Sequence, residues 1–168
     1  MRSLALATVA LVLLVTAPPR ADAQVGYGAQ LNFADDFDFG VGGHLLFGTE
    51  QVLEGTRLSA SFDYYFPDDD SDLVDVNFWE INVNGHWFVP LENSPVRLYV
   101  GPGLHIARVS VDVENDTVFG GEADDTELGL NVLGGIEIPV EAAVTPFAEL
   151  KIELGGAEQF VLTAGLRF

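Results

Sequence analysis

The last ten residues of the chain, from Gln159 to Phe168, alternate between two kinds of side chain. Every second residue counted back from Phe168 to Phe160 is apolar or small, and most residues between them are polar or glycine. Strict two-residue alternation is typical of a β-strand with one apolar and one polar face. Such a strand needs partners on both edges, and a closed barrel supplies them.

The first 23 residues have a different composition from the rest. Arg2 supplies a positive start, Leu4–Thr16 is an apolar run, and Ala21-Asp22-Ala23 is a small-x-small cleavage site. The apolar run is too short to span a bilayer as a helix. We therefore predict a secretory signal peptide over residues 1–23 and a single domain over residues 24–168.

The charge of the chain narrows its range of partners. The formal net charge is −19, and removal of Arg2, Arg20 and Asp22 with the signal peptide leaves 5 basic and 25 acidic residues, a charge of −20. So acidic a protein repels nucleic acid and favours cations or solvation. Cysteine is absent, which excludes disulfides and thiol chemistry.

The region after the signal peptide divides into eight alternating segments separated by turn signals, and no segment in it has a helical period. The predicted strands are Val25–Phe33, Phe39–Phe47, Arg57–Phe66, Val76–Val89, Arg97–Val109, Glu127–Ile138, Thr145–Leu154 and Gln159–Phe168. The longest predicted loop, Asp112–Asp125, is acidic and contains glycine. The pattern predicts an all-β, eight-stranded, antiparallel up-and-down barrel, with the last strand closing against the first.

Two architectures fit eight such strands: a soluble lipocalin-like barrel with its apolar face inward, or an outer-membrane barrel with its apolar face against lipid. The polar faces combine many glycines with Gln30, Asn82, Asn84 and Asn131. A narrow lumen needs small residues beside large polar ones, whereas the outside of a soluble barrel does not. We therefore expect the apolar face to point outward.

Aromatic residues on the apolar faces are spaced as two membrane girdles would be. The predicted girdle residues form three same-face pairs, each eight residues apart: Phe39 and Phe47, Trp79 and Trp87, and Phe160 and Phe168. Eight tilted residues rise roughly 20 Å, close to the apolar band of an outer-membrane barrel. An even strand count puts both termini on one side, which we predict to be the periplasm, and three acidic loops on the other.

Taken together, the signal peptide, the eight strands, the Tyr99-Val-Gly-Pro-Gly-Leu104 pattern and the terminal Phe168 resemble the small outer-membrane β-barrel family that includes OmpA and OmpX. The resemblance covers the whole chain after the signal peptide. It implies that the aromatic terminal strand is recognised by the outer-membrane assembly machinery. We expect no peptidoglycan-binding domain after Phe168, so that part of OmpA's role is not expected to carry over.

Nine charged residues fall on the polar faces and are predicted to point into the lumen. They are Arg57, Asp63, Glu80, Arg97, Glu137, Glu149, Lys151, Glu153 and Arg167. Charges in a narrow lumen must pair or hold water. Four of these residues lie near the predicted periplasmic strand ends: Arg57, Arg97, Glu137 and Arg167. We interpret them as a salt-bridged plug with a structural role; the alternative is a gate or a narrow ion path.

None of the remaining candidate residues forms a pattern that predicts a metal site or a catalytic site. His44, His86 and His105 point inward at different depths, which argues against a shared metal site. Asp68-x-Asp70-x-Asp72 begins like an EF-hand loop, but Leu73 stands at the glycine position and the motif fails. We expect no cofactor, metal site or catalytic residue, and outer-membrane lipid or lipopolysaccharide as the surroundings. The acidic loops are predicted to be solvated, with loose Ca²⁺ or Mg²⁺ binding as the alternative.

The sequence therefore predicts an outer-membrane barrel with a structural or surface-interaction role. A small passive pore is the first alternative. An enzyme acting on lipid A is the second, and it is disfavoured because no Ser–His pair lies on the outward face.

Overall fold

The computed structural model describes residues 25–35, 38–49, 52–67, 74–113, 122–140, 143–156 and 158–168. Its eight strands are β1 (Val25–Ala34), β2 (Asp38–Gly48), β3 (Thr56–Phe66), β4 (Val74–Val89), β5 (Arg97–Val113), β6 (Glu122–Glu137), β7 (Thr145–Leu154) and β8 (Phe160–Arg167). The predicted signal peptide lies outside the described residues. Within them, no helix is long and apolar enough to cross a membrane.

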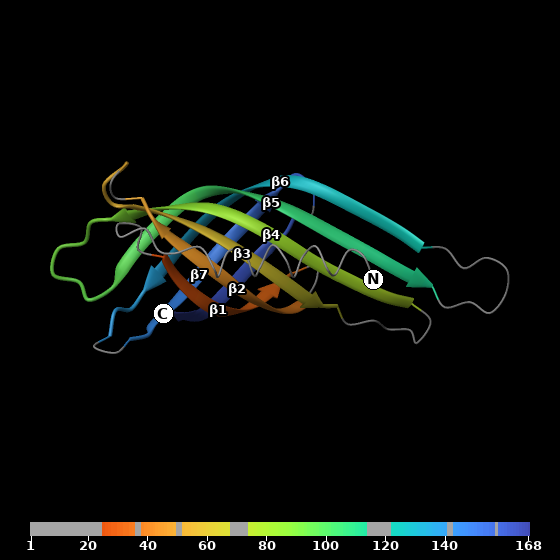
Figure 1. Cartoon of the computed structure of the whole chain (residues 1–168), viewed down its shortest axis with the longest axis horizontal. Coiled ribbons are helices and arrows are strands. Elements are labelled where there is room, and N and C mark those ends of the chain that lie inside the picture. The colour runs from red at the N-terminus through yellow and green to blue at the C-terminus, as the bar shows by residue number, and fades with distance from the viewer. Residues whose placement is uncertain are drawn as a thin grey trace.

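Each strand pairs antiparallel with its neighbours in sequence, and β8 pairs with β1 to close the barrel (Figure 1). The closing register sets Ala34 opposite Val161 and Gly28 opposite Arg167. The predicted all-β, eight-stranded closed barrel is therefore confirmed. We call the end that holds Val25 and Phe168 the terminal end, and the opposite end the loop end.

Three neighbouring strands are longer than the others. β4, β5 and β6 have 16, 17 and 16 residues, and they extend past the remaining strands at the loop end (Figure 1). The prediction of a loop over Asp112–Asp125 was therefore wrong at both edges, because Asp112 pairs with Glu122 in the β5–β6 ladder. Valines at alternate positions from Val109 to Val113 favour the strand there.

Apolar side chains lie on the outside of the barrel. Leu128 is 69% exposed, Tyr27 and Trp87 are each 60% exposed, and the outward positions of every strand carry further exposed apolar residues. The buried side chains are mostly polar or charged. This arrangement is the reverse of a soluble barrel and confirms the predicted direction of the two faces.

Candidate functional site: the filled interior of the barrel

The terminal end of the interior is occupied by arginines that converge on one carboxylate. Glu137 on β6 is fully buried. Arg57 Nη2 from β3 lies 2.5 Å from its Oε1, Arg97 Nη2 from β5 lies 2.7 Å from its Oε2, and Arg167 from β8 also pairs with it. We call Arg57, Arg97, Glu137 and Arg167 the ion-pair cluster.

Aromatic rings hold the arginines of the ion-pair cluster in place. The Arg57 guanidinium lies 4.9 Å from the centre of the Phe88 ring, and that of Arg167 lies 3.8 Å from the centre of the Phe147 ring. Arg167 also donates to the Tyr99 hydroxyl, which in turn donates to Glu149 at 2.8 Å. These contacts restrict the long arginine side chains and cover their planar faces, so that the cluster fills this end of the lumen.

The middle of the barrel contains a network of amides and carboxylates. Asp63 on β3 accepts hydrogen bonds from four side chains of three strands: Gln30 at 2.6 Å, Asn32 at 2.7 Å, Ser61 at 2.8 Å and Asn82 at 3.1 Å. These donors take the place of water around a side chain that is only 1% exposed. The network therefore satisfies this carboxylate without a cation beside it.

A buried lysine joins the other two carboxylates of the same network. Lys151 Nζ on β7 pairs with Glu80 and Glu153 and donates to Asn82 Oδ1 at 3.0 Å. Gln159 donates to both carboxylates at 2.7 Å. The central network thus contains three carboxylates and one cation, with amides supplying the remaining hydrogen bonds.

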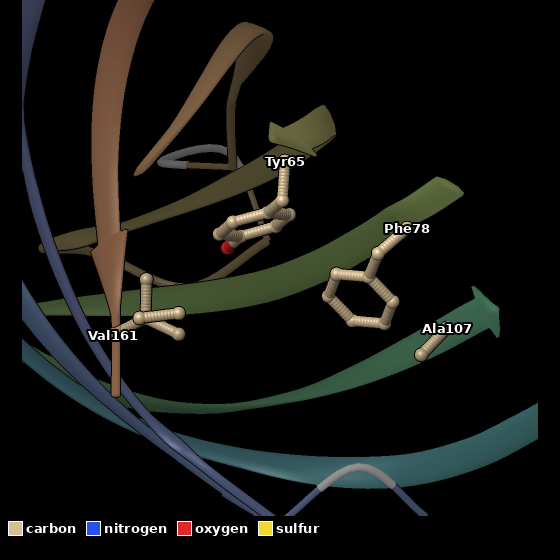
Figure 2. Packing of buried hydrophobic residues seen from close by; sticks show 5 residues of the cluster. Tyr65, Phe78, Ala107 and Val161 are labelled. Atoms are coloured by element: carbon tan, nitrogen blue, oxygen red, sulfur yellow. The ribbon is translucent and has the colours of Figure 1, made fainter. Parts of the chain in front are cut away.

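An apolar layer closes the interior on the loop side of the central network. It consists of Ala34, Tyr65, Phe78, Ala107 and Val161, and Figure 2 shows Tyr65, Phe78, Val161 and Ala107 from different strands directed into the barrel. The Tyr65 and Phe78 rings lie 5.1 Å apart. Each member stands two residues toward the loop end from a buried polar residue of the same strand, as Tyr65 does from Asp63.

Sequence reasoning placed Tyr65, Ala107 and Val161 on the polar faces that point inward, but it assigned Ala34 to a loop and did not identify a layer. The signal was present, because the inward positions change from polar to apolar near the loop end of several strands. What a single strand does not show is the stagger around the barrel that brings these positions to one level.

The nine predicted lumen charges do not form one cluster. Four of them make the ion-pair cluster, Glu149 joins it through Tyr99, and the other four belong to the central network. Eight of them lie inside the barrel, whereas the Arg97 side chain is 52% exposed and lies at the terminal mouth.

Three of the six predicted girdle residues lie toward the loop end and three toward the terminal end, and neighbouring aromatics extend both groups. At the terminal end Phe168 stacks on Tyr27, with ring centres 5.4 Å apart. At the loop end Phe39 stacks on Phe66 at 6.3 Å, and Trp79 lies 6.0 Å from Phe62. The other predicted members are Phe47 and Trp87, near the terminal end, and Phe160, near the loop end.

The fold, the outward apolar surface and the filled polar interior define a small eight-stranded barrel of the outer-membrane type. The chain matches the outer membrane protein beta-barrel domain family over residues 7–164 and belongs to that family. No curated protein is detectably similar to it in sequence.

Solved structures share the fold at low sequence identity. Neisserial surface protein A is 20% identical, with a TM-score of 0.62, over 85% of this chain and 94% of that one. The N-terminal β-barrel domain of Pseudomonas aeruginosa OprF is 15% identical, with a TM-score of 0.60, over 88% and 100%. Ail, the attachment invasion locus protein of Yersinia pestis, is 16% identical, with a TM-score of 0.58, over 87% and 97%. At these identities the likeness concerns the fold alone.

Proposed function

We propose that the protein is a closed structural barrel of the outer membrane whose loop end acts as an interaction surface, and that it is neither a channel nor an enzyme. The observation that carries this proposal is the filled interior. The ion-pair cluster, the central network and the apolar layer follow one another along the barrel, and Glu137, Glu80 and Phe78 are each 0% exposed. An ion crossing the barrel would have to displace buried groups from all three.

The orientation is part of the proposal. The terminal end faces the periplasm and the loop end faces outward, as the family's even number of strands and long outer loops favour. The extended parts of β4, β5 and β6 then stand beyond the membrane, where both faces of a strand meet water and acidic residues are tolerated. Exposed Asp125 and Glu127 of β6 agree with this placement.

Conductance in planar bilayers tests the closed barrel against the passive pore. We expect purified, folded protein to show no stable current steps at any salt concentration, like a protein-free detergent control. Reproducible openings that scale with salt would overturn the closed-barrel proposal and favour the pore.

Absence of enzymatic activity is tested separately. All three histidines are buried on the inward face, where lipid has no access to them. Mass analysis of lipid A from cells with and without the protein should give identical species. A mass change that depends on the protein would establish a lipid-modifying activity instead.

The partners follow from the surfaces. The outward apolar face is proposed to contact outer-membrane lipid, including lipopolysaccharide, and the terminal strand β8 to be read by the barrel assembly machinery. The acidic loop end is proposed to hold Ca²⁺ or Mg²⁺ loosely. The loop over residues 68–72 that carries part of this charge lies outside the described residues, so the test is calorimetric: weak heat on Ca²⁺ addition is expected, and no heat would remove cation binding from the proposal.

A further inference from the structure

His105 on β5 is a buried histidine, and one of its two ring nitrogens has no hydrogen-bond partner. The side chain is 1% exposed, and its cross-strand neighbour on β6 is Gly129. The imidazole occupies the space of the missing Gly129 side chain, since a Cβ there would lie 2.5 Å from His105 Nε2. Its Nδ1 lies 2.7 Å from Asn131 Oδ1, whereas its Nε2 has no hydrogen-bond partner.

The central network determines which nitrogen of His105 carries the proton. Lys151 has only donors, so the Asn82 atom 3.0 Å from its Nζ must be the oxygen. Asn131 Nδ2 lies 2.9 Å from that same oxygen and 2.8 Å from Asn84 Oδ1, so the Asn131 amide nitrogen faces these acceptors.

The Asn131 oxygen therefore faces His105. Because an amide oxygen only accepts hydrogen bonds, His105 Nδ1 must donate the proton between them. The neutral imidazole then has its lone pair on Nε2. A histidine that donates from one nitrogen to a fixed oxygen and offers a lone pair on the other has the arrangement usual for metal-ligating histidines.

Nε2 of His105 and two oxygens border one small space at the loop end of the barrel. A Cβ on Gly156 would lie 3.7 Å from His105 Nε2 and 3.3 Å from Glu127 Oε2, so both atoms border the same small space. The Gly155 carbonyl oxygen borders this space as well, because it is the atom that a Cβ on Gly129 would meet first, beside the His105 ring. Gly155 and Gly156 form the β7–β8 turn over this space, with φ of 75° and 74°, values that favour glycine.

We propose that His105 Nε2, the Glu127 carboxylate and the Gly155 carbonyl form a binding site for a divalent transition-metal ion of the zinc class, with water completing its coordination. An imidazole nitrogen and a carboxylate oxygen are ligands that Zn²⁺ accepts and that Mg²⁺ and Ca²⁺ do not favour as a set. No group of three His, Asp or Glu side chains among the described residues is arranged to hold a metal, so two side chains and a backbone oxygen make this a site of modest affinity. The proposal does not depend on the proposed function.

The chain contains a matched control in His44 on β2. This ring also lies opposite a glycine, Gly28, and its Nδ1 lies 2.7 Å from Gln30 Oε1. Gln30 Nε2 donates to Asp63, so the same reasoning puts the lone pair on His44 Nε2, which has no partner. The described contacts of that nitrogen include no carboxylate; the ring is packed edge-on against Phe147.

The test uses the full barrel, ¹⁵N-labelled at histidine, in lipid nanodiscs with excess Mg²⁺ to occupy the acidic loops. Before metal is added, both His44 and His105 should show a lone-pair nitrogen at Nε2. Titration with Zn²⁺ should shift the Nε2 signal of His105 and leave that of His44 unchanged. Glu127→Gln, which changes an exposed side chain, should weaken the response at least tenfold, and His105→Gln should abolish the saturable zinc binding seen by calorimetry.

Three results would overturn the proposal. They are a proton on His105 Nε2 in the metal-free protein, equal zinc responses of the two histidines, and unchanged zinc affinity in the Glu127→Gln protein. Because the nitrogen signals are read in the folded protein before any substitution, loss of folding in a variant leaves the first two criteria in force.

Discussion

Arg57 on β3 and Glu137 on β6 meet inside the barrel with Nη2 and Oε1 2.5 Å apart, although 80 residues separate them in sequence. Glu137 also pairs with Arg97 and Arg167, so one fully buried carboxylate contacts three guanidinium groups from three strands. The ion-pair cluster therefore depends on Glu137 more than on any single arginine.

Replacing Glu137 by glutamine should destabilise the barrel strongly. Removing one partner of a buried ion pair leaves the other charge uncompensated, at a cost of about 3–5 kcal/mol. Guanidinium unfolding in detergent micelles, followed by fluorescence of the two tryptophans, measures the change. Glu92→Gln, an exposed position in the β4–β5 connection at the same end, is the control and should stay within about 0.5 kcal/mol of the parent. Equal stabilities of the two variants would show that the cluster contributes little.

Lys151 allows a second test, in which the cation of the central network is removed instead of an anion. Lys151→Met alone leaves the buried Glu80 and Glu153 carboxylates without their cation and should cost about 3–5 kcal/mol. Adding Glu80→Gln and Glu153→Gln removes the charges as well, and the triple variant should recover most of that loss. Unfolding midpoints of the parent, the single and the triple variant decide the matter. A triple variant as unstable as the single one would locate the loss in packing instead of charge.

Adjacent glycines on β2 provide a third test. A Cβ on the inward Gly42 would collide with the Asp63 carboxylate, whereas one on the outward Gly43 would have its nearest contact at 3.6 Å, with the Gly28 carbonyl oxygen. Gly42→Ala should therefore cost about 1–3 kcal/mol through overpacking. Gly43→Ala should be neutral or stabilising by up to about 1 kcal/mol, because it reduces the entropy of the unfolded chain. The order of the two unfolding midpoints is the measurement, and a reversed order would contradict the inward and outward placement of the pair.

The sequence predicted the strands and their faces because alternation is a local property. Each strand contains its own evidence, and the eight predicted ranges differ from the observed ones mainly where β5 and β6 extend into the acidic segment. The inward direction of Glu80 and Lys151 followed from the same alternation. That they pair with each other did not follow, because partners inside a barrel are set by the stagger between strands and not by order in the sequence.

The predicted charge group therefore separated into two in the structure. Position along the strand indicated that Arg57, Arg97, Glu137 and Arg167 share one end. Asp63, by contrast, acquires four donors from three strands that no motif connects. The sequence also could not predict which nitrogen of His105 carries the lone pair. That assignment depends on the orientation of the Asn131 amide, which in turn depends on Asn82 and Lys151.

Phe168 closes the barrel, and its removal should impair assembly more than any other property. Its backbone N–H donates to the Tyr27 carbonyl at 2.7 Å, and its own carbonyl accepts from the Tyr27 N–H at 3.3 Å. Its ring stacks on that of Tyr27 on the outer surface. Deleting Phe168 therefore removes a pair of backbone hydrogen bonds and an aromatic pair from the β1–β8 closure, where the edges must be satisfied within the membrane.

The measurement is the amount of heat-modifiable, folded protein in isolated outer membranes, compared with the total amount synthesised. We expect the deletion to reduce the folded fraction several-fold. Phe168→Tyr, which keeps the backbone groups and an aromatic ring, should remain near the parent level. Phe168→Ala separates the two contributions: it keeps the backbone pair but loses the ring contact, and its yield should fall between the other two. If the deletion variant reached the outer membrane as efficiently as the parent, closure at Tyr27 and recognition of β8 would not depend on this residue.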